Sequence, residues 1–236
     1  MKRILITAGA TFEPIDSVRG ITNLSTGRTA CAVAEGFLAS GHHVVFVAGR
    51  GCRQIVAFEG ASLESIPFVT YGDLRRILEE RLRNDDFDVI VHAAAVSDFS
   101  VSTPISGKMT SGGPMTIELA PNPKLIHKLK RWSRNRDVKI IAFKLTSGLE
   151  TEAENMKVRT LFGGGDVDLV VHNRVEDRSM DGARAFRVLA RGGAVGAAET
   201  PEELGRILEA HPFASEPLAR SSFDVSTEVS TDEIPL

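Results

Sequence analysis

A short segment near the N-terminus combines side chains that commonly bind anions. Arg19 and Asn23 precede Ser25, Thr26 and Gly27, which lie at the start of a helical pattern. Hydroxyls and free backbone N–H groups at a helix N-terminus favour a phosphate or carboxylate, because the helix dipole is positive at that end. A guanidinium adds charge-assisted hydrogen bonds to the same anion. The segment therefore predicts an anion site; an ordinary Ser/Thr cap beside a solvated arginine is the alternative.

Further candidates for ligand binding follow two apolar runs. Gly9 lies in the loop after the first run, where nucleotide-binding turns occur, although the G-x-G-x-x-G spacing of a dinucleotide site is absent. Asp98 follows Ala94 and Ala95, whose small side chains allow a ligand to approach the backbone. Its carboxylate would accept hydrogen bonds from a sugar or an amine. The alternative is structural, because alanines also permit close helix packing and an aspartate also caps turns.

A lysine and a phenylalanine complete the candidates. Lys108 lies in a long segment, residues 100–122, and a connection of this length predicts a functional loop. A cation on such a loop can close over a phosphate, although an exposed lysine is usually only solvated. Phe143 ends an apolar run and would stack on a base, with core packing as the alternative. The His and Cys residues lack the spacing of a metal site, so no metal ligands are predicted.

Apolar runs that alternate with helical patterns must position these residues. Such runs are typical of a parallel sheet buried on both faces, so we predict an α/β, Rossmann-like, doubly wound and mostly parallel sheet. Ligands then bind at the carboxyl ends of the strands. The strands are expected at residues 3–7, 43–48, 62–67, 88–93, 138–143 and 167–172, and the helices at about 26–40, 71–83 and 150–161.

The last part of the chain shows different patterns. Residues 185–190 and 194–196 predict a late antiparallel hairpin around Gly192 and Gly193, followed by a helix that Thr200 caps. Within the flap loop that carries Lys108, residues 115–119 look like a strand. We expect residues 1–212 to form a single domain and the acidic, Ser/Thr-rich residues 213–236 to be a disordered tail.

Composition and charge exclude several classes of protein. The 236 residues contain 28 Lys+Arg and 31 Asp+Glu, so the formal charge of -3 argues against a dedicated nucleic-acid binder. Hydrophobic content of 42% and charged content of 25% are typical of a globular protein. No apolar run approaches the roughly 20 residues that cross a bilayer. With no signal-peptide pattern and only Cys31 and Cys52, a cytoplasmic protein without membrane association is expected.

Several motifs occur in one order along the chain. They are Arg19–Arg28, Ala93–Asp98, Lys108-Met109, Asn122-Pro123, Phe143–Leu145 and Val171–Asn173. From Met1 to about Glu209 the chain resembles the phosphopantothenoylcysteine synthetases, which join 4'-phosphopantothenate to L-cysteine in coenzyme A biosynthesis. The resemblance implies a Rossmann-like fold, a homodimer and, because no flavin-dependent decarboxylase half precedes the region, the stand-alone form. The hairpin at Gly192-Gly193 is our candidate for part of the dimer interface.

The resemblance also implies a two-step reaction. CTP or ATP, with Mg²⁺ held through phosphate oxygens and water, activates the pantothenate carboxylate as an acyl-nucleotide, which the cysteine amine then attacks. Asn23 and Lys108 would be catalytic. The substrate phosphate would contact Arg19, Ser25, Thr26, Gly27 and Ala95. The nucleotide would contact Gly9, Ala94, Asp98, Lys108, Asn122, Pro123, Phe143 and Lys157.

Two residues depart from the family pattern, and two other functions are alternatives to the ligase. Leu161 replaces a second basic nucleotide contact, for which Arg159 is a substitute, and His172 replaces a small residue. The choice between CTP and ATP stays open. An NAD(P)-dependent oxidoreductase is the first alternative, but Tyr71 is followed by Arg75 rather than by the lysine of a Tyr-x-x-x-Lys pair. A non-catalytic regulatory subunit is the second.

Overall fold

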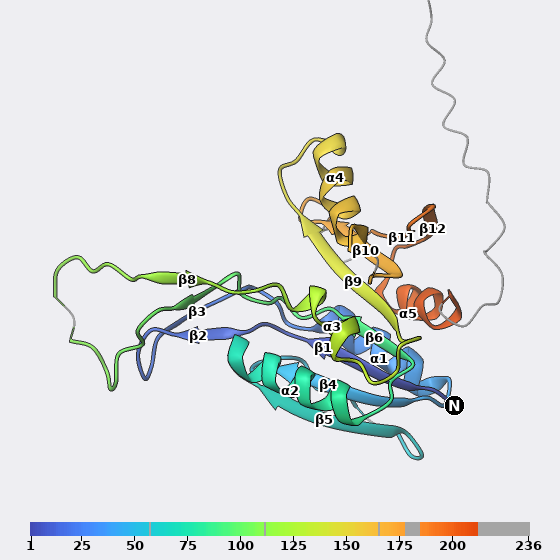
Figure 1. Ribbon diagram of the computed structural model, residues 1–236, viewed down its shortest axis with the longest axis horizontal. Coiled ribbons are helices and arrows are strands. Elements are labelled where there is room, and N and C mark those ends of the chain that lie inside the picture. Colours follow the sequence, from blue (N-terminus) through green and yellow to red (C-terminus); the bar gives the residue numbers. More distant parts are fainter. Residues whose placement is uncertain (57, 111, 165, 178–184, 212–236) are drawn as a thin grey trace, which may run out of the picture.

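A mixed sheet forms the centre of the protein. The computed structural model describes residues 1–56, 58–110, 112–164, 166–177 and 185–211 (Figure 1), so the predicted tail at 213–236 lies outside the described residues. Within them, an eight-stranded sheet has the order β12-β11-β10-β9-β6-β1-β4-β5. Its parallel strands are β1 (Arg3–Ala8), β4 (His43–Gly49), β5 (Ser62–Phe68), β6 (Val89–His92), β9 (Lys139–Thr146) and β10 (Leu169–Arg174).

The two last strands reverse direction, as the sequence predicts. β11 (Phe186–Ala190) pairs antiparallel with β10, and β12 (Gly193–Ala198) pairs antiparallel with β11. The helix that follows, α5 (Pro201–Ala210), begins at the predicted cap, where the Glu203 N–H donates to Thr200 Oγ1 at 3.1 Å. The α/β prediction with a late antiparallel hairpin is therefore confirmed.

Helices cover both faces of the sheet and create two apolar clusters. α1 (Arg28–Ala39) and α5 lie on one face, where Phe37 and Leu204 are fully buried. α2 (Tyr71–Asn84), α3 (Leu129–Trp132) and α4 (Thr151–Phe162), with the short 3-10 helix η1 (Leu125–His127), lie on the other. Strands sandwiched in this way lose water from both sides, which explains why the central runs are continuously apolar rather than alternating.

The strand order locates the place where a ligand is expected. The parallel strands read β5-β4-β1-β6-β9-β10, which is the 3-2-1-4-5-6 order of a doubly wound sheet. The direction of winding changes between β1 and β6. In such sheets ligands bind outside the carboxyl ends of the strands at this switch point. The loops that follow Ala8 and His92 must therefore form the site.

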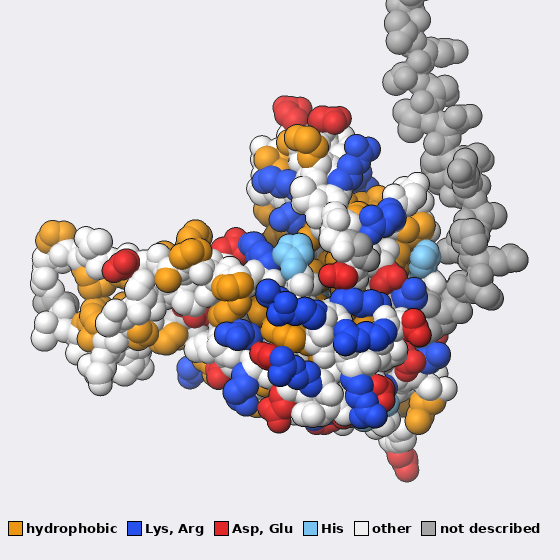
Figure 2. Space-filling view, in the orientation of Figure 1, with side chains coloured by type: hydrophobic (Ala, Val, Ile, Leu, Met, Phe, Trp, Pro, Cys, Tyr) orange, Lys and Arg blue, Asp and Glu red, His pale blue; other side chains and the backbone are white. Residues whose placement is uncertain are grey.

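An arm projects from this end of the sheet (Figure 1). It consists of the described residues in 12–22 and 99–121. The hairpin of β2 (Phe12–Pro14) and β3 (Gly20–Thr22) forms part of it, together with the pair β7 (Phe99–Val101) and β8 (Leu119–Pro121). Apolar side chains gather on its surface in Figure 2. The arm is built from strands of only three residues, so few backbone hydrogen bonds hold each pair together.

The structure corrects two local predictions. The helix expected from residue 26 begins at Arg28, because Gly27 is the N-cap and adopts a left-handed conformation with φ 71°. The strand expected at 115–119 is also wrong, since β8 covers only Leu119–Pro121. The extent of β8 follows from its partner: β7 is three residues long and pairs Phe99 with Pro121.

Candidate functional site

Three separate segments meet at the switch point. The Ala95 N–H, beyond β6, donates to the Gly9 carbonyl, beyond β1, at 2.8 Å. The Ala95 carbonyl in turn accepts the Thr11 N–H at 3.2 Å and the Asn23 side-chain amide at 3.3 Å. These contacts bring Asn23 from the loop before α1 to the carboxyl ends of the two central strands. The structure therefore places Gly9, Asn23 and Ala95 together, at the edge where a ligand is expected.

Two glycines shape the entrance to α1. A Cβ on Gly27 would lie 2.2 Å from Cys52 Sγ, and a Cβ on Gly9 would lie 3.0 Å from Cys52 Cβ. Both glycines also have positive φ, 71° and 78°. No side chain caps α1, and the neighbouring Thr26 carbonyl accepts the Arg53 N–H at 2.9 Å. Only glycine therefore fits at these two positions. The first N–H groups of α1 and the Ser25 hydroxyl lie beside them.

A buried histidine supports the same edge from beneath. His92, the last residue of β6, is buried, and its Nδ1 lies 3.0 Å from Thr7 Oγ1. The Thr7 hydroxyl also accepts the Ala94 N–H at 3.1 Å, so it links His92 to the backbone that follows β6. Burial lowers the pKa of His92 to about 4. This uncharged contact fixes Ala94 at the rim of the site.

Asp98 and Asn122 form the next part of the rim. The Asn122 N–H donates to the Asp98 carbonyl at 2.8 Å, and its side-chain amide donates to the Ser97 carbonyl at 3.1 Å. The Asp98 carboxylate is exposed and forms an ion pair with Lys124 Nζ. Pro123, between Asn122 and Lys124, accepts a hydrogen bond from another element, described below. Asp98 is thus held by its backbone while its side chain faces solvent.

Charged and aromatic side chains follow β9. Phe143 is half-buried and packs on the cluster beneath α1, which leaves part of its ring at the edge. Lys144 is also half-buried, and its pKa is lowered by burial first and then by the positive charges of Lys157 and Lys124, with Asp98 acting in the opposite direction. These four charged groups therefore lie close enough to interact. Lys157 comes from the exposed side of α4.

A buried hydrogen-bond chain holds α4 against the end of β9. Arg187 Nη2 donates to His172 Nδ1 at 2.8 Å, which leaves Nε2 to donate to Thr146 Oγ1 at 2.9 Å. The Thr146 hydroxyl donates to Glu154 Oε1 on α4 at 2.9 Å. Burial and the Arg187 charge lower the pKa of His172, in agreement with a neutral ring. His172, which departs from the family pattern, thus positions Thr146 and, through it, Glu154, which lies one turn before Lys157 on α4.

Arg19 and Lys108 lie elsewhere, on the arm. Asp16 Oδ1 accepts the N–H groups of Val18 and Arg19, at 2.8 and 2.7 Å, and its Oδ2 accepts the Met109 N–H at 3.1 Å. These backbone donors lower the pKa of Asp16, with a further contribution from the Arg19 charge, since Nη1 lies 3.2 Å from Oδ2. Asp16 thus joins Lys108, the neighbour of Met109, to the turn. The three-residue β3, about 10 Å long, separates this turn from Asn23.

The sequence of this chain is similar to those of known proteins. The model of the DNA/pantothenate metabolism flavoprotein C-terminal domain family matches residues 1–198. The chain belongs to this family. The chain is similar to a coenzyme A biosynthesis bifunctional protein, CoaBC, from Thermococcus kodakarensis, which is 35% identical over 175 residues, or 74% of this chain and 42% of that protein. CoaBC of Bacillus subtilis is 30% identical over 176 residues, or 74% of this chain and 41% of that protein.

Solved structures show the same fold. The DNA/pantothenate metabolism flavoprotein from Streptococcus pneumoniae has a TM-score of 0.77 at 23% identity, covering 88% of this chain and 96% of that chain. A Cab2 mutant in complex with phosphopantothenate-cysteine has a TM-score of 0.71 at 20% identity, covering 88% and 85%. The chain spans about two fifths of the length of the two CoaBC proteins.

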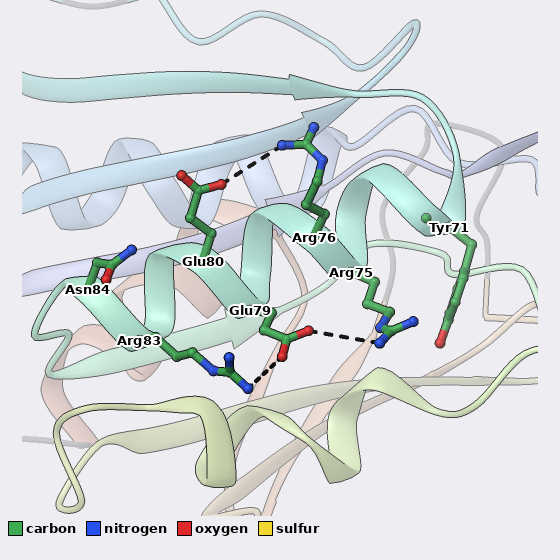
Figure 3. A pocket seen from close by; sticks show the side chains of 8 residues that line it. Tyr71, Arg75, Arg76, Glu79, Glu80, Arg83 and Asn84 are labelled. Carbon is green, nitrogen blue, oxygen red and sulfur yellow. Dashed lines mark ion pairs between the residues drawn. The ribbon is translucent and has the colours of Figure 1, made fainter.

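A cleft along α2 lies away from the switch point. Its cavity volume is about 670 Å³, and it runs along the outer side of α2 (Figure 3). Its three arginines exceed its two glutamates by one charge: Glu79 accepts Arg83 at 2.6 Å and lies 4.0 Å from Arg75, and Arg76 lies 3.8 Å from Glu80. The Tyr71 hydroxyl at one end donates to the Pro123 carbonyl at 2.7 Å. This hydrogen bond ties the start of α2 to the loop that contains Pro123, and the cleft beside it offers little net charge to a ligand.

In the part of the chain that the structure describes, no three His, Cys, Asp or Glu side chains are grouped to hold a metal ion. The helices in the same part are too short or too polar to cross a membrane.

Sequence reasoning gave no separate role to three charged residues that the structure places near the predicted ones. Asp16 stands in a predicted surface loop, and nothing in its neighbourhood signals that it reaches Met109. Lys124 directly follows the Asn122-Pro123 motif, which is the only local signal for it. Lys144 follows Phe143, but its meeting with Lys124 depends on tertiary structure. Leu161, where the family pattern expects a cation, packs against the core.

Proposed function

We propose that this protein is a phosphopantothenate–cysteine ligase of coenzyme A biosynthesis. The observation that carries the proposal is the contact of Asn23 with Ala95, because it joins the anion-binding segment to the switch point of the sheet. Membership of the family and the relatives involved in coenzyme A biosynthesis support it. The long separation between β1 and α1, where a dinucleotide-binding turn would be short, argues against the NAD(P)-dependent alternative.

Two substrate sites follow from the arrangement. The phosphate of phosphopantothenate would bind at Ser25, Thr26, Gly27 and the first N–H groups of α1, where no acidic residue occupies the first turn. The nucleotide would bind across the ends of β6 and β9, near Ala94, Asp98, Asn122, Pro123, Phe143 and Lys157. The carboxylate of the first substrate would then lie between the two phosphate sites, beside Asn23.

The reaction proceeds in two balanced steps. A carboxylate oxygen of phosphopantothenate attacks the α-phosphorus of CTP or ATP, so that pyrophosphate leaves and an acyl-nucleotide forms. The cysteine amine then attacks the acyl carbon, loses a proton, and the nucleoside monophosphate leaves. Asn23 donates a hydrogen bond to the reacting oxygen without neutralising the nearby phosphate. When bound with the triphosphate, Mg²⁺ would neutralise part of its charge and would be held through phosphate oxygens and water.

The assembly and location of the enzyme are further parts of the proposal. A homodimer is supported by the exposed apolar side chains of the arm, and the hairpin of β11 and β12, where we expected the interface, exposes no large apolar side chain in its described residues. Lys108 and Arg19 lie on this arm, so assembly would bear on catalysis. The two thiols, Cys31 and Cys52, are free, which supports a reducing compartment such as the cytoplasm.

A direct assay tests the function. Purified protein is mixed with 4'-phosphopantothenate, L-cysteine, Mg²⁺ and either CTP or ATP, and pyrophosphate and phosphopantothenoylcysteine are measured separately. We expect both products in equal amounts with at least one nucleotide. Pyrophosphate with neither nucleotide would refute the proposal.

Asn23→Asp tests the role of the amide. We expect pyrophosphate to be released in excess of phosphopantothenoylcysteine, because a carboxylate cannot donate the hydrogen bond and repels the charged intermediate. The second step should slow by about 100-fold, the loss typical of one such donor. Asn84→Asp, an exposed change of the same chemistry at the end of α2, is the matched control and should behave like the parent protein. Equal turnover of both variants would remove Asn23 from the mechanism.

A further inference from the structure

Three lysines from distant parts of the sequence converge at the end of β9. Lys144 is half-buried and follows Phe143 near the carboxyl end of β9. Lys124 comes from the loop before η1, and Lys157 from α4. The charges of Lys157 and Lys124 both act on Lys144 and lower its pKa, in addition to burial. The geometry agrees, because β9 lies beside β6, whose continuation carries Asp98, and Lys124 forms an ion pair with that carboxylate.

This group of charges is poorly compensated. Among the described residues, the ammonium groups of Lys144 and Lys157 have no hydrogen-bond or ion-pair partner, and the one carboxylate acting on Lys144 is Asp98. Asp98 is already paired with Lys124. Three ammonium groups against one carboxylate repel one another, and the burial of Lys144 increases that repulsion. A polyanion would relieve this repulsion.

We propose that Lys124 and Lys144, together with Lys157, form the subsite for the polyphosphate of the nucleotide, and that Asp98 holds Lys124 until the polyphosphate binds. The identity of the anion as part of CTP or ATP rests on the proposed function. On binding, Lys124 moves from the Asp98 carboxylate to a phosphate oxygen. Asp98 is then free to accept hydrogen bonds from the hydroxyls of the nucleoside.

The exposure of the ion pair makes this exchange easy. The side chains of Lys124 and Asp98 are 57% and 61% exposed, so water competes for both groups and the pair adds little to stability. The backbone of Asp98 is fixed by Asn122, and Pro123 is fixed by Tyr71, so only the two side chains need to move. The arrangement also explains how the chain manages with Leu161 in place of a cation: Lys144 and Lys124 supply positive charge at the same rim.

Inorganic pyrophosphate is the probe for this subsite, because it carries the polyphosphate charge without the base or ribose. Its affinity for the full chain is measured by isothermal titration calorimetry. We expect Lys144→Met and Lys124→Met each to weaken binding by about tenfold, the effect of losing one charged hydrogen bond. Lys139→Met is the matched control: Lys139 lies at the other end of β9, pairs with Asp168 at 3.1 Å, and should leave the affinity unchanged.

Asp98→Asn provides a test with the opposite sign. It removes the negative charge from the cluster and releases Lys124, so pyrophosphate should bind several-fold more tightly than to the parent protein. Partial unfolding cannot produce this increase. Affinities of Lys144→Met and Lys124→Met equal to that of the parent, weaker binding to Asp98→Asn, or no binding of pyrophosphate to the parent would each overturn the proposal.

The two proposals fail in distinguishable ways. If the parent makes phosphopantothenoylcysteine but Lys144→Met binds pyrophosphate like the parent, the subsite is wrong and the ligase stands. If the parent makes no product while the lysine variants weaken binding and Asp98→Asn strengthens it, the polyphosphate subsite stands and the ligase is wrong.

Discussion

The carboxyl edge of the sheet and the arm carry residues of one sequence motif, but different forces hold them. At the edge, the exposed Asn23 side chain donates one hydrogen bond to the Ala95 carbonyl, and Gly27 lies so close to Cys52 that an added Cβ would collide with its sulfur. Arg19, only four residues before Asn23, lies on the arm, where the Asp16 carboxylate joins the turn to the flap. The edge therefore depends on close packing around Gly27, whereas the arm depends on a few hydrogen bonds to the buried Asp16 carboxylate.

The surfaces of the two regions differ in the same sense. On the arm, Val18, Ile105 and Met115 expose 62%, 47% and 53% of their surface (Figure 2). At the sheet edge Ala94 is small, and the exposed apolar side chains there, Leu24 and Leu145, come from separate segments of the chain. Large exposed apolar side chains grouped on one projection are typical of an interaction surface. We infer that the edge binds the small ligands, and that the arm becomes ordered against a second copy of the chain.

Gly27→Ala tests packing at the edge and should have the largest effect. Its Cβ would lie 2.2 Å from Cys52 Sγ, and φ is 71°. Overpacking and a left-handed alanine together should lower the free energy of unfolding by about 4 kcal/mol. The measurement is urea denaturation. Gly41→Ala is the matched control, since it has φ 77° but no atom within 4 Å of the added Cβ, and it should cost about 1 kcal/mol. Equal losses would show that packing at the edge is loose.

Acid should weaken the edge before it weakens the arm. The pKa of His92 is lowered to about 4 from 6.5, so the unfolded chain binds a proton at a pH where the folded chain does not. Stability therefore falls as the pH drops from 6.5 to 4 and levels off below, by about 3 kcal/mol in total. Urea denaturation at pH 7 and pH 4.5 measures the loss.

The arm supplies the contrast for this acid test. It contains no histidine, and one of its buried carboxylates, Asp16, has a lowered pKa, so the contacts of Asp16 persist until the pH falls below the ordinary range of aspartate. Replacing the exposed His127 by Gln should leave the pH dependence unchanged, whereas His92→Gln should reduce it, and His172, whose pKa is also lowered by burial, accounts for what remains. Equal pH dependence in parent and His92→Gln would show that another group controls the acid response.

The smallest effect is expected for the surface of the arm. The double variant Ile105→Ser, Met115→Ser should weaken dimerisation at least tenfold, because two apolar side chains lose their contacts with the partner. The free energy of unfolding of each chain should barely change. Sedimentation velocity measures the assembly, and Val56→Ser, an exposed apolar residue outside the arm, is the control. A monomeric parent, or an unchanged dimer in the double variant, would assign the arm another role.

The main elements of the fold and part of the site are readable in the sequence. Continuous apolar runs such as residues 43–48 predict buried parallel strands, because burial on both faces leaves no polar alternation. The position of Asn23, Asp98 and Phe143 after or between these runs predicts that they lie at one edge. The glycine at 27 was recognised as part of an anion site, although its left-handed conformation moved the start of α1 by two residues.

The amino-acid pattern alone established the order of strands and helices, the small residues at the strand ends and the resemblance to a family. It could not show that Arg19 leaves the site on an arm, that Asp16 holds the flap, or that Lys124 pairs with Asp98 near Lys144. Periodicity and capping are local properties, carried by residues a few positions apart. The meeting of charges from β9, α4 and the loop before η1 depends instead on which strand ends lie side by side, and that is decided by long-range pairing and packing.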